Sequence, residues 1–239
     1  MCGRFTLRTL PNKMIQQVFA GLDLGEIEQQ TARVNIAPTQ NIPVIRTETG
    51  QAARDDGPIA DLARWGLLPP WAKELSLGAR MINARSETVA EKPAFRSAYR
   101  SRRCVIPADG YIEWVKQADG KQPYWMHHVD DQHEHAGFFF AGLWERNSQL
   151  GKDVSSPLHS ATILTTVATE QLSSIHDRMP VVLTPAGVDA WLMQSADIAD
   201  LSANSGTLFP EDFFTITPIS RRINSVRNQS EDDFEVIDD

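Results

Sequence analysis

The stretch C-V-I-P-A-D-G-Y-I-E-W-V, residues 104–115, contains two short apolar runs separated by a turn sequence. Residues 104–107 and 111–115 are rich in β-branched and aromatic side chains, which favour strands. Ala108-Asp109-Gly110 between them is typical of a turn. The pattern therefore predicts two short strands on either side of a turn.

The rest of the chain predicts more short elements of the same kind. Segment 35–39 is expected to be a loop, because the residue before Pro38 is pushed out of the helical region. Residues 47–57 and 130–135 are expected to be hairpin tips or mobile loops. Further β-prone or apolar runs lie at residues 42–46, 62–68, 124–129, 138–144, 160–166 and 213–218, and helices are expected at 11–20, 169–175 and 185–194.

No linker or internal repeat divides these elements. The sequence therefore predicts one α+β domain, with a curled, barrel-like mixed β-sheet core flanked by short helices, over residues 1–228. Residues 229–239 form an acidic tail that is expected to be flexible. Without a signal peptide or a transmembrane run, the expected setting is cytoplasmic, and Cys2 and Cys104 are expected to be free thiols.

The net charge of −8 is unevenly distributed along the chain. The tail from residue 231 to 239 holds six acids and no base, which leaves 23 bases against 25 acids elsewhere. Residues 80–103 hold seven bases and only two acids. Since a polyanion responds to a local patch more than to the total charge, this run is either a nucleic-acid contact or a solvated basic face.

Cys2 directly follows the start methionine, and two interpretations of its thiol are open. If Met1 is removed, Cys2 carries a free α-amine and a thiol on adjacent carbons. An α-amine has an ordinary pKa of roughly 7.7–8.0, so a fraction of it is neutral and nucleophilic near neutral pH. Such an aminothiol condenses with an aldehyde to a Schiff base and then to a five-membered thiazolidine ring. The alternative is a passive buried cysteine.

Other polar residues are candidates for a site, each with an ordinary alternative. Glu113 lies between apolar neighbours, where desolvation would raise its pKa and suit acid–base chemistry, or it is a surface glutamate. His176 is a proton-transfer group or a histidine at a helix C-terminus. Asn83 is a functional or a turn residue, and Arg85 could bind phosphate. The histidines at 127, 128, 133 and 135 lack zinc-site spacing, so neither a metal nor a cofactor is expected.

Six sequence blocks occur in an order that resembles one family. They are M-C-G-R-F at residues 1–5, N-x-A-P-T at 35–39, R-W-G-L-x-P-x-W at 64–71, I-N-A-R-x-E-T at 82–88, R-C-x-x-P-A-D-G-Y-x-E-W at 103–114 and H-D-R-M-P at 176–180. The chain is similar to the SRAP family, the SOS-response-associated peptidases, which are understood as abasic-site processing proteins.

The resemblance implies a covalent function. It implies binding to abasic sites in single-stranded DNA and a thiazolidine crosslink between Cys2, after self-processing removal of Met1, and the ring-opened deoxyribose. It further implies that Glu113 is the acid–base group, that His176 shuttles protons and that Asn83 orients the Cys2 amine. The residues implied to contact the DNA are Arg4, Trp71, Arg85, Thr165 and Arg178.

Two other functions stay open at this point. One is a thiol peptidase that uses Cys2 and His176 as nucleophile and base. The other is a reader that binds single-stranded or modified DNA without a covalent step. The favoured expectation is a monomer in the nucleoid region that acts on abasic DNA through lyase-type Schiff-base chemistry, with no membrane partner.

Overall fold

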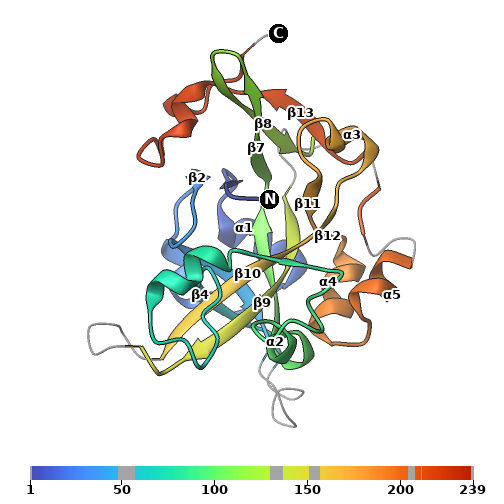
Figure 1. Cartoon of the computed structure of the whole chain (residues 1–239). Helices are drawn as coiled ribbons and strands as arrows, with labels where there is room; N and C mark the ends of the chain where they lie inside the picture. The colour runs from blue at the N-terminus through green and yellow to red at the C-terminus, as the bar shows by residue number, and fades with distance from the viewer. Residues whose placement is uncertain are drawn as a thin grey trace.

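The computed structural model describes residues 2–47, 57–129, 137–150, 157–203, 208–210 and 212–237 (Figure 1). The hairpin tips expected at residues 47–57 and 130–135 fall outside this part of the chain, except for Thr47 and Gly57.

Five strands of the described chain close into a barrel. They pair in the order β10-β4-β3-β6-β9, and β9 pairs back to β10. The β10–β4 pair is parallel and the others are antiparallel, so the barrel is mixed. These strands are β3 (Asn41–Arg46), β4 (Ile59–Trp65), β6 (Arg103–Ala108), β9 (Phe138–Asn147) and β10 (Leu158–Val167). The predicted α+β class with a curled mixed sheet is confirmed.

Three short strands extend the barrel sheet. β5 (Asn83–Arg85) and β11 (Arg178–Pro180) pair with β10, and β12 (Val182–Leu183) pairs with β9. Because β5 and β11 both attach to β10, two distant sequence blocks are brought to one part of the sheet.

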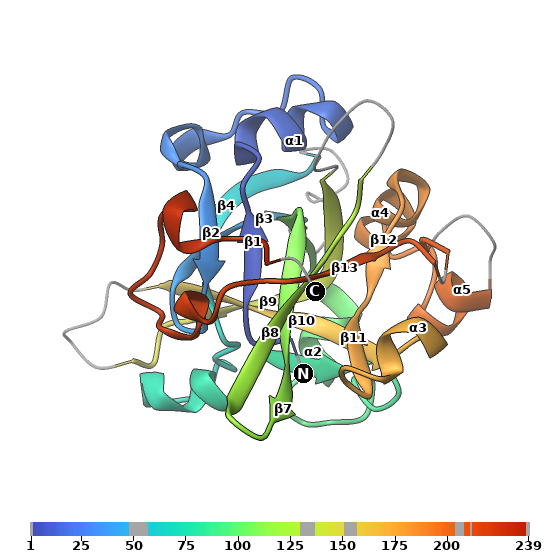
Figure 2. The same ribbon diagram turned by 90° about the horizontal axis from the view of Figure 1, so that it is seen from above.

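A second, antiparallel sheet lies against the barrel in the order β13-β8-β7-β1-β2 (Figure 2). Its strands are β1 (Phe5–Leu7), β2 (Arg33–Ile36), β7 (Gly110–Gln117), β8 (Gly120–His127) and β13 (Thr215–Pro218). Phe5 of β1 joins the two layers, because its ring packs edge-on against Trp65 at 5.2 Å and Phe140 at 5.9 Å between ring centroids.

The turn predicted at residues 108–110 is the corner at which the chain passes from one sheet to the other. Only Asp109 separates β6 of the barrel from β7 of the second sheet. Its buried carboxylate accepts hydrogen bonds from Thr6 Oγ1 at 2.7 Å and from the Thr9 backbone N–H at 2.6 Å. These bonds tie the corner to the N-terminal segment.

Short helices cover the outside of the sheets. The α-helices are α1 (Pro11–Val18), α2 (Arg96–Ser101), α3 (Glu170–Ser173), α4 (Pro185–Leu192) and α5 (Ile198–Ala203), and the 3-10 helices are η1 (Gly25–Gln29), η3 (Leu75–Arg80), η4 (Arg221–Asn224) and η5 (Glu231–Asp233). The helices predicted at 11–20, 169–175 and 185–194 are confirmed with shorter bounds. Across the described residues, every helix falls short of the length and apolarity needed to cross a membrane.

The loop expected at residues 35–39 begins inside β2, which pairs with β1. The buried Asn35 side chain donates to the carbonyl oxygens of Ile223, Ser225 and Asn228. The short helices α2 and α5 were not predicted. The described part of the predicted tail, residues 229–237, makes contacts with the second sheet. Phe234 is buried with its ring 4.9 Å from that of Trp125.

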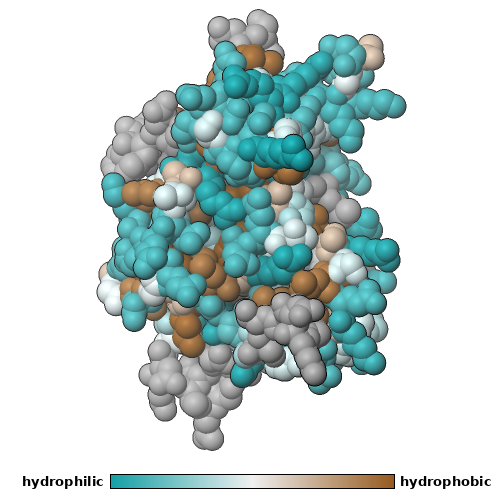
Figure 3. All heavy atoms as spheres, turned by 90° about the vertical axis from the view of Figure 1, so that its left-hand side faces the viewer, coloured by the Kyte–Doolittle hydropathy of each residue, from teal (hydrophilic) through white to brown (hydrophobic). Residues whose placement is uncertain are grey.

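The face shown in Figure 3 is mainly hydrophilic, with hydrophobic side chains in small separate patches. Such scattered patches are ordinary for a protein surface and need no partner to cover them.

Candidate active site

The N-terminal segment is held inside the protein by backbone and side-chain contacts. Cys2 is fully buried, and its thiol donates a weak hydrogen bond to the Arg4 carbonyl at 3.7 Å. The same carbonyl accepts the backbone N–H of Ile112 at 3.0 Å. The Asn83 side-chain amide donates to the Cys2 carbonyl at 2.8 Å. These contacts fix Cys2 between β7 and β5.

Strand β5 brings Asn83 and Arg85 to one side of the sheet. Side chains alternate along a strand, so these two share a face while the buried Ala84 takes the other. In the parallel pairing with β10, Arg85 lies opposite Thr165. Arg85 is exposed and Thr165 is fully buried, so the edge of the site carries a cation that solvent can reach.

Glu113 is a buried carboxyl group on β7, with 5% of its surface exposed. Burial raises its pKa to about 7, because the charged form loses its hydration. The pKa of the Cys2 thiol is also raised, first by burial and then by the negative charge of Glu113. The pKa of the Tyr111 hydroxyl is likewise raised, first by burial and then by the negative charges of Cys2 and Glu113. The three groups therefore form one coupled cluster.

His176 lies in the turn between α3 and β11. Its Nδ1 accepts the backbone N–H of Arg178 at 2.9 Å and lies 2.9 Å from the Asp177 carboxylate. The pKa of His176 is lowered, chiefly because partial burial disfavours the imidazolium. The negative charge of Asp177 further raises the pKa of Glu113. This turn therefore borders the Glu113 cluster.

Arg178 is held within the protein rather than presented to solvent. Its guanidinium makes two bonds to the Glu87 carboxylate, at 2.5 and 2.8 Å, and donates to the Thr165 carbonyl at 2.6 Å. Only 8% of the residue is exposed. Glu87 and the Thr165 carbonyl therefore hold the Arg178 guanidinium in place, and its contact with DNA stays a prediction.

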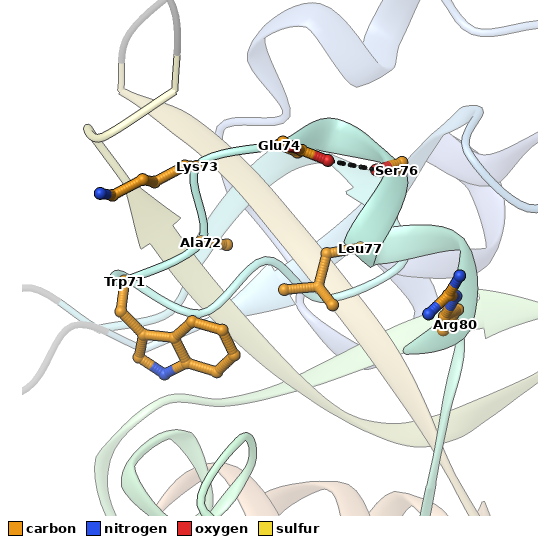
Figure 4. Close-up of a pocket in the computed structure, with 7 residues that line it drawn as sticks. All are labelled: Trp71, Ala72, Lys73, Glu74, Ser76, Leu77 and Arg80. Atoms are coloured by element: carbon orange, nitrogen blue, oxygen red, sulfur yellow. Dashed lines mark hydrogen bonds between the residues drawn. The ribbon is translucent and has the colours of Figure 1, made fainter.

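Arg4 and Trp71 occupy two different places. The half-buried Arg4 guanidinium lies 5.6 Å from the centre of the Trp114 ring. Trp71 is 57% exposed and lines a hollow with Lys73, Leu77 and Arg80 (Figure 4). That hollow contains none of the residues around Cys2.

The basic run at residues 80–103 splits into two groups. Arg102 bonds to Glu145 at 2.8 Å, and the buried Arg103 bonds to Asp197 at 3.1 Å. These two arginines help to hold α2 and α5 in place. The remaining bases of the run are exposed: Arg80, Arg85, Lys92, Arg96 and Arg100.

Three residues at the site did not emerge from sequence reasoning. The first is Tyr111, whose pKa is raised by burial and by the charges of Cys2 and Glu113. The second is Asp177, whose carboxylate lies 2.9 Å from His176 Nδ1, and the third is Glu87, which forms an ion pair with Arg178. Each lies inside one of the quoted sequence blocks, one or two residues from a candidate. This closeness to a candidate residue is the sequence signal that could have identified them.

Comparison with known proteins gives a consistent result. The family model for SOS response associated peptidase (SRAP) matches residues 1–226. The abasic site processing protein YoqW of Bacillus subtilis is 39% identical over 233 residues, which cover 96% of this chain and 97% of YoqW. The abasic site processing protein YedK of Escherichia coli is 30% identical over 233 residues, which cover 96% of each. A crystal structure of a protein from Bacteroides thetaiotaomicron has the same fold, with a TM-score of 0.74 over 94% of this chain and 95% of that chain at 23% identity.

Proposed function

The chain belongs to the SOS response associated peptidase (SRAP) family, and we propose that it crosslinks itself to abasic sites in single-stranded DNA. Family membership and relatives named as abasic site processing proteins support the substrate class. The observation that carries the proposal is the cluster of Cys2, Tyr111 and Glu113. An N-terminal cysteine lies fixed by Asn83 and coupled to a carboxyl group whose pKa is about 7.

The proposed reaction begins when removal of Met1 exposes the Cys2 α-amine. The amine attacks the aldehyde carbon of the ring-opened deoxyribose, and loss of water gives an iminium ion. The Cys2 sulfur then adds to that carbon, and its proton leaves the thiol. The ring closes as a thiazolidine, so the overall balance is aldehyde plus aminothiol to thiazolidine plus one water.

Glu113 is suited to the proton transfers in this sequence. A carboxyl group with a pKa of about 7 is part protonated and part ionised near neutral pH. It can therefore donate a proton when the sugar ring opens, accept one when the amine adds to the aldehyde, and return it to the departing hydroxyl when the iminium ion forms. His176 is kept neutral by its lowered pKa, and since Nδ1 accepts the Arg178 N–H, its Nε2 carries a proton that it can pass on in this sequence. Asn83 holds the Cys2 carbonyl, which orients the adjacent amine.

The buried thiol argues against a peptidase acting on other proteins. A thiol nucleophile of that kind needs a lowered pKa, so that the thiolate forms near neutral pH. Here burial raises the pKa of Cys2. In the proposed reaction the amine attacks first, so a thiolate is not required at the start.

The test is intact-mass spectrometry of the purified protein before and after incubation with a single-stranded oligonucleotide that contains one abasic site. We expect a chain without Met1 and then an adduct equal to protein plus oligonucleotide minus one water. Cys2→Ala should abolish the adduct. Cys104→Ala is the matched control and should retain it, because the buried Cys104 belongs to the barrel core.

Two outcomes would overturn this function. One is the absence of any adduct from protein with a free Cys2. The other is an adduct that persists in Cys2→Ala without a reductant, which would assign the stable covalent bond to another nucleophile. Cys2→Ala and Cys2→Ser both retain the α-amine, so each should give a Schiff base that only borohydride traps, whereas the adduct that is stable without a reductant requires the Cys2 thiol.

A further inference from the structure

His176 Nδ1 has two neighbours of opposite kind, in the turn that joins α3 to β11 (Figure 1). The backbone N–H of Arg178 lies 2.9 Å away and can only donate a hydrogen bond. The ionised carboxylate of Asp177 also lies 2.9 Å away, and it can only accept one. Because a ring nitrogen carries either a lone pair or a proton, Nδ1 bonds to one of the two neighbours at a time. The turn therefore offers His176 two hydrogen-bonded states.

The backbone on both sides of this nitrogen is anchored. The Arg178 guanidinium is held by the Glu87 carboxylate and donates to the Thr165 carbonyl at 2.6 Å. The carbonyl of Asp177 accepts the backbone N–H of Ala168 at 3.0 Å. A change of partner at Nδ1 therefore requires a different position of the proton and little movement of the chain.

The proton balance of His176 requires both states. With its Nδ1 lone pair bound to the Arg178 N–H, neutral His176 carries its proton on Nε2 and acts there only as an acid. Loss of that proton alone would leave a negatively charged ring, which is not one of the forms that histidine adopts near neutral pH. Nδ1 must therefore gain a proton before Nε2 gives one away. The ring that remains is protonated at Nδ1, and its Nε2 is a base.

From this geometry we propose that Asp177 is a positioning residue that accepts the Nδ1 proton of His176 and so converts Nε2 from a proton donor into a proton acceptor. Water supplies the Nδ1 proton, because the Asp177 side chain is 84% exposed. In the forward direction one proton moves from water to Nδ1 and one from Nε2 to the reacting sugar, and reversal of the crosslink returns both. The inference rests on the proposed function for the task of Nε2, but the position of the proton can be measured without DNA.

Other charges act on the same ring and shape the test. Burial lowers the pKa of His176 most, the positive charges of the amino terminus and of Arg178 lower it further, and the negative charge of Asp177 raises it. Asp177 also raises the pKa of Glu113. Removal of the Asp177 charge should therefore lower both pKa values. Because a rate profile alone would mix the two effects, the test includes a direct measurement at His176.

The first measurement is NMR of isotope-labelled histidine ring nitrogens in the free protein, from about pH 5 to about pH 8, where histidines titrate. The signals of His176 are those that are lost in His176→Gln. In the wild type we expect part of the neutral ring to be protonated at Nδ1. Asp177→Asn should shift the neutral ring to the Nε2-protonated form and weaken proton binding by roughly threefold, the size expected of an exposed ion pair. Asp177→Glu should restore both properties.

The second measurement is the pH dependence of crosslink formation with a single-stranded oligonucleotide that contains one abasic site. Asp177→Asn should react about fivefold more slowly, a small part of the roughly hundredfold or more that a proton-transfer group contributes. The midpoint of its pH profile should move to lower pH together with the titration of His176. Asp177→Glu should recover most of the rate, because it returns a carboxylate to the turn.

The matched control is Asp232→Asn, which removes an exposed carboxylate from η5 in the C-terminal segment. The net charge changes by the same amount as in Asp177→Asn. The control should keep the wild-type position of the His176 proton, its titration and the rate of crosslink formation.

Three results would overturn the proposal. One is an unchanged titration and proton position of His176 in Asp177→Asn, and another is an equal shift in the Asp232→Asn control. The third is a rate loss that Asp177→Glu fails to recover and that leaves the pH midpoint in place, since this is the result of a structural role. Failure of the proposed function looks different. In that case no protein forms an adduct with abasic DNA, while the ring-nitrogen signals still show whether Asp177 holds the Nδ1 proton.

Discussion

Glu113 is a buried carboxyl group that costs stability when it is ionised. Its carboxyl group has an ordinary pKa of 4.5, and burial raises this to about 7 in the folded chain. Between these values the unfolded chain has lost the proton while the folded chain retains it. The free energy of unfolding therefore falls as pH rises from about 4.5 to about 7, and the loss is constant above that range.

Replacing Glu113 with Gln should make the protein more stable at alkaline pH. The gain at pH 8 should approach about 3 kcal/mol, since each pKa unit corresponds to about 1.4 kcal/mol. At pH 4 the glutamate is protonated in both states, so variant and wild type should unfold alike. Urea titrations at the two pH values measure the difference.

The control for this change is Glu170→Gln, which alters an exposed glutamate at the start of α3. It should leave the difference between the two pH values unchanged. If Glu113→Gln gives the same gain at both pH values, the raised pKa of Glu113 is not the cause.

At this scale the sequence predicted residue types better than residue contacts. The apolar neighbours of Glu113 indicated partial desolvation, and its raised pKa agrees. The bond between Asn83 and Cys2 joins residues 81 positions apart, and no local pattern encodes such a pair. Only the order of the family blocks indicated that the two meet. Arg178 looked available for phosphate, because its partner Glu87 lies 91 positions away.

Among the structural elements, the β6–β7 corner is the least tolerant of change. Gly110 begins β7, and a Cβ atom there would lie 1.9 Å from Trp125 Nε1 and 2.8 Å from Thr6 Oγ1. Trp125 Nε1 already donates to that threonine at 3.1 Å. The absence of a side chain at Gly110 therefore allows β1, β7 and β8 to meet.

Gly110→Ala should destabilise the protein by about 3 kcal/mol or more, since overpacking of a well-packed core typically costs 1–3 kcal/mol and the contact here is unusually short. The midpoint of urea denaturation gives the change. Gly21→Ala is the control, because a Cβ atom there meets nothing within 4 Å and only its φ of +78° is strained. The control should cost about 1 kcal/mol. Equal losses in both variants would show that the corner is not close-packed.

Local sequence predicted the presence of this corner but not its role. Ala108-Asp109-Gly110 correctly indicated a turn between two strands. Which sheet each strand joins depends on the pairing of β6 with β3 and β9 and of β7 with β1, and these partners lie far away in the sequence. The β7–β8 hairpin is local. The short helix α2 was missed for a related reason, because its six residues are too few to show a helical period.

For the molecule as a whole, the arrangement of charge matters more than its sum. The acids of the C-terminal segment give the chain much of its negative total. Two of them form ion pairs: Glu231 bonds to Arg8 at 2.7 Å, and Asp233 lies 3.4 Å from Arg222. Arg80, Arg96 and Arg100 are exposed and form no ion pair among the described residues. A protein of net charge −8 can thus carry a locally cationic surface.

The C-terminal segment also pairs with the edge of the second sheet. Its backbone pairs with the end of β13, where Ser220 N–H donates to the Glu235 carbonyl at 2.7 Å and Ile237 N–H donates to the Pro218 carbonyl at 3.1 Å. Composition alone predicted flexibility here, because six acids in nine residues resemble a disordered tail. The aromatic ring of Phe234 packs against Trp125 and against the Arg8 guanidinium, 4.7 Å from its ring centre.

Phe234→Ala therefore tests whether the tail is part of the fold. Truncating a buried phenylalanine to alanine typically costs 3–5 kcal/mol, and a chain of this size loses about 2–4 °C of Tm for each kcal/mol. We expect a fall of roughly 6–20 °C in calorimetry. Glu231→Gln, which removes only an exposed ion pair, should shift Tm by no more than about 2–4 °C, because such pairs contribute at most about 1 kcal/mol. A tail that only solvates the protein would leave Tm unchanged in both variants, whereas a tail held by charge alone would give the larger fall in Glu231→Gln.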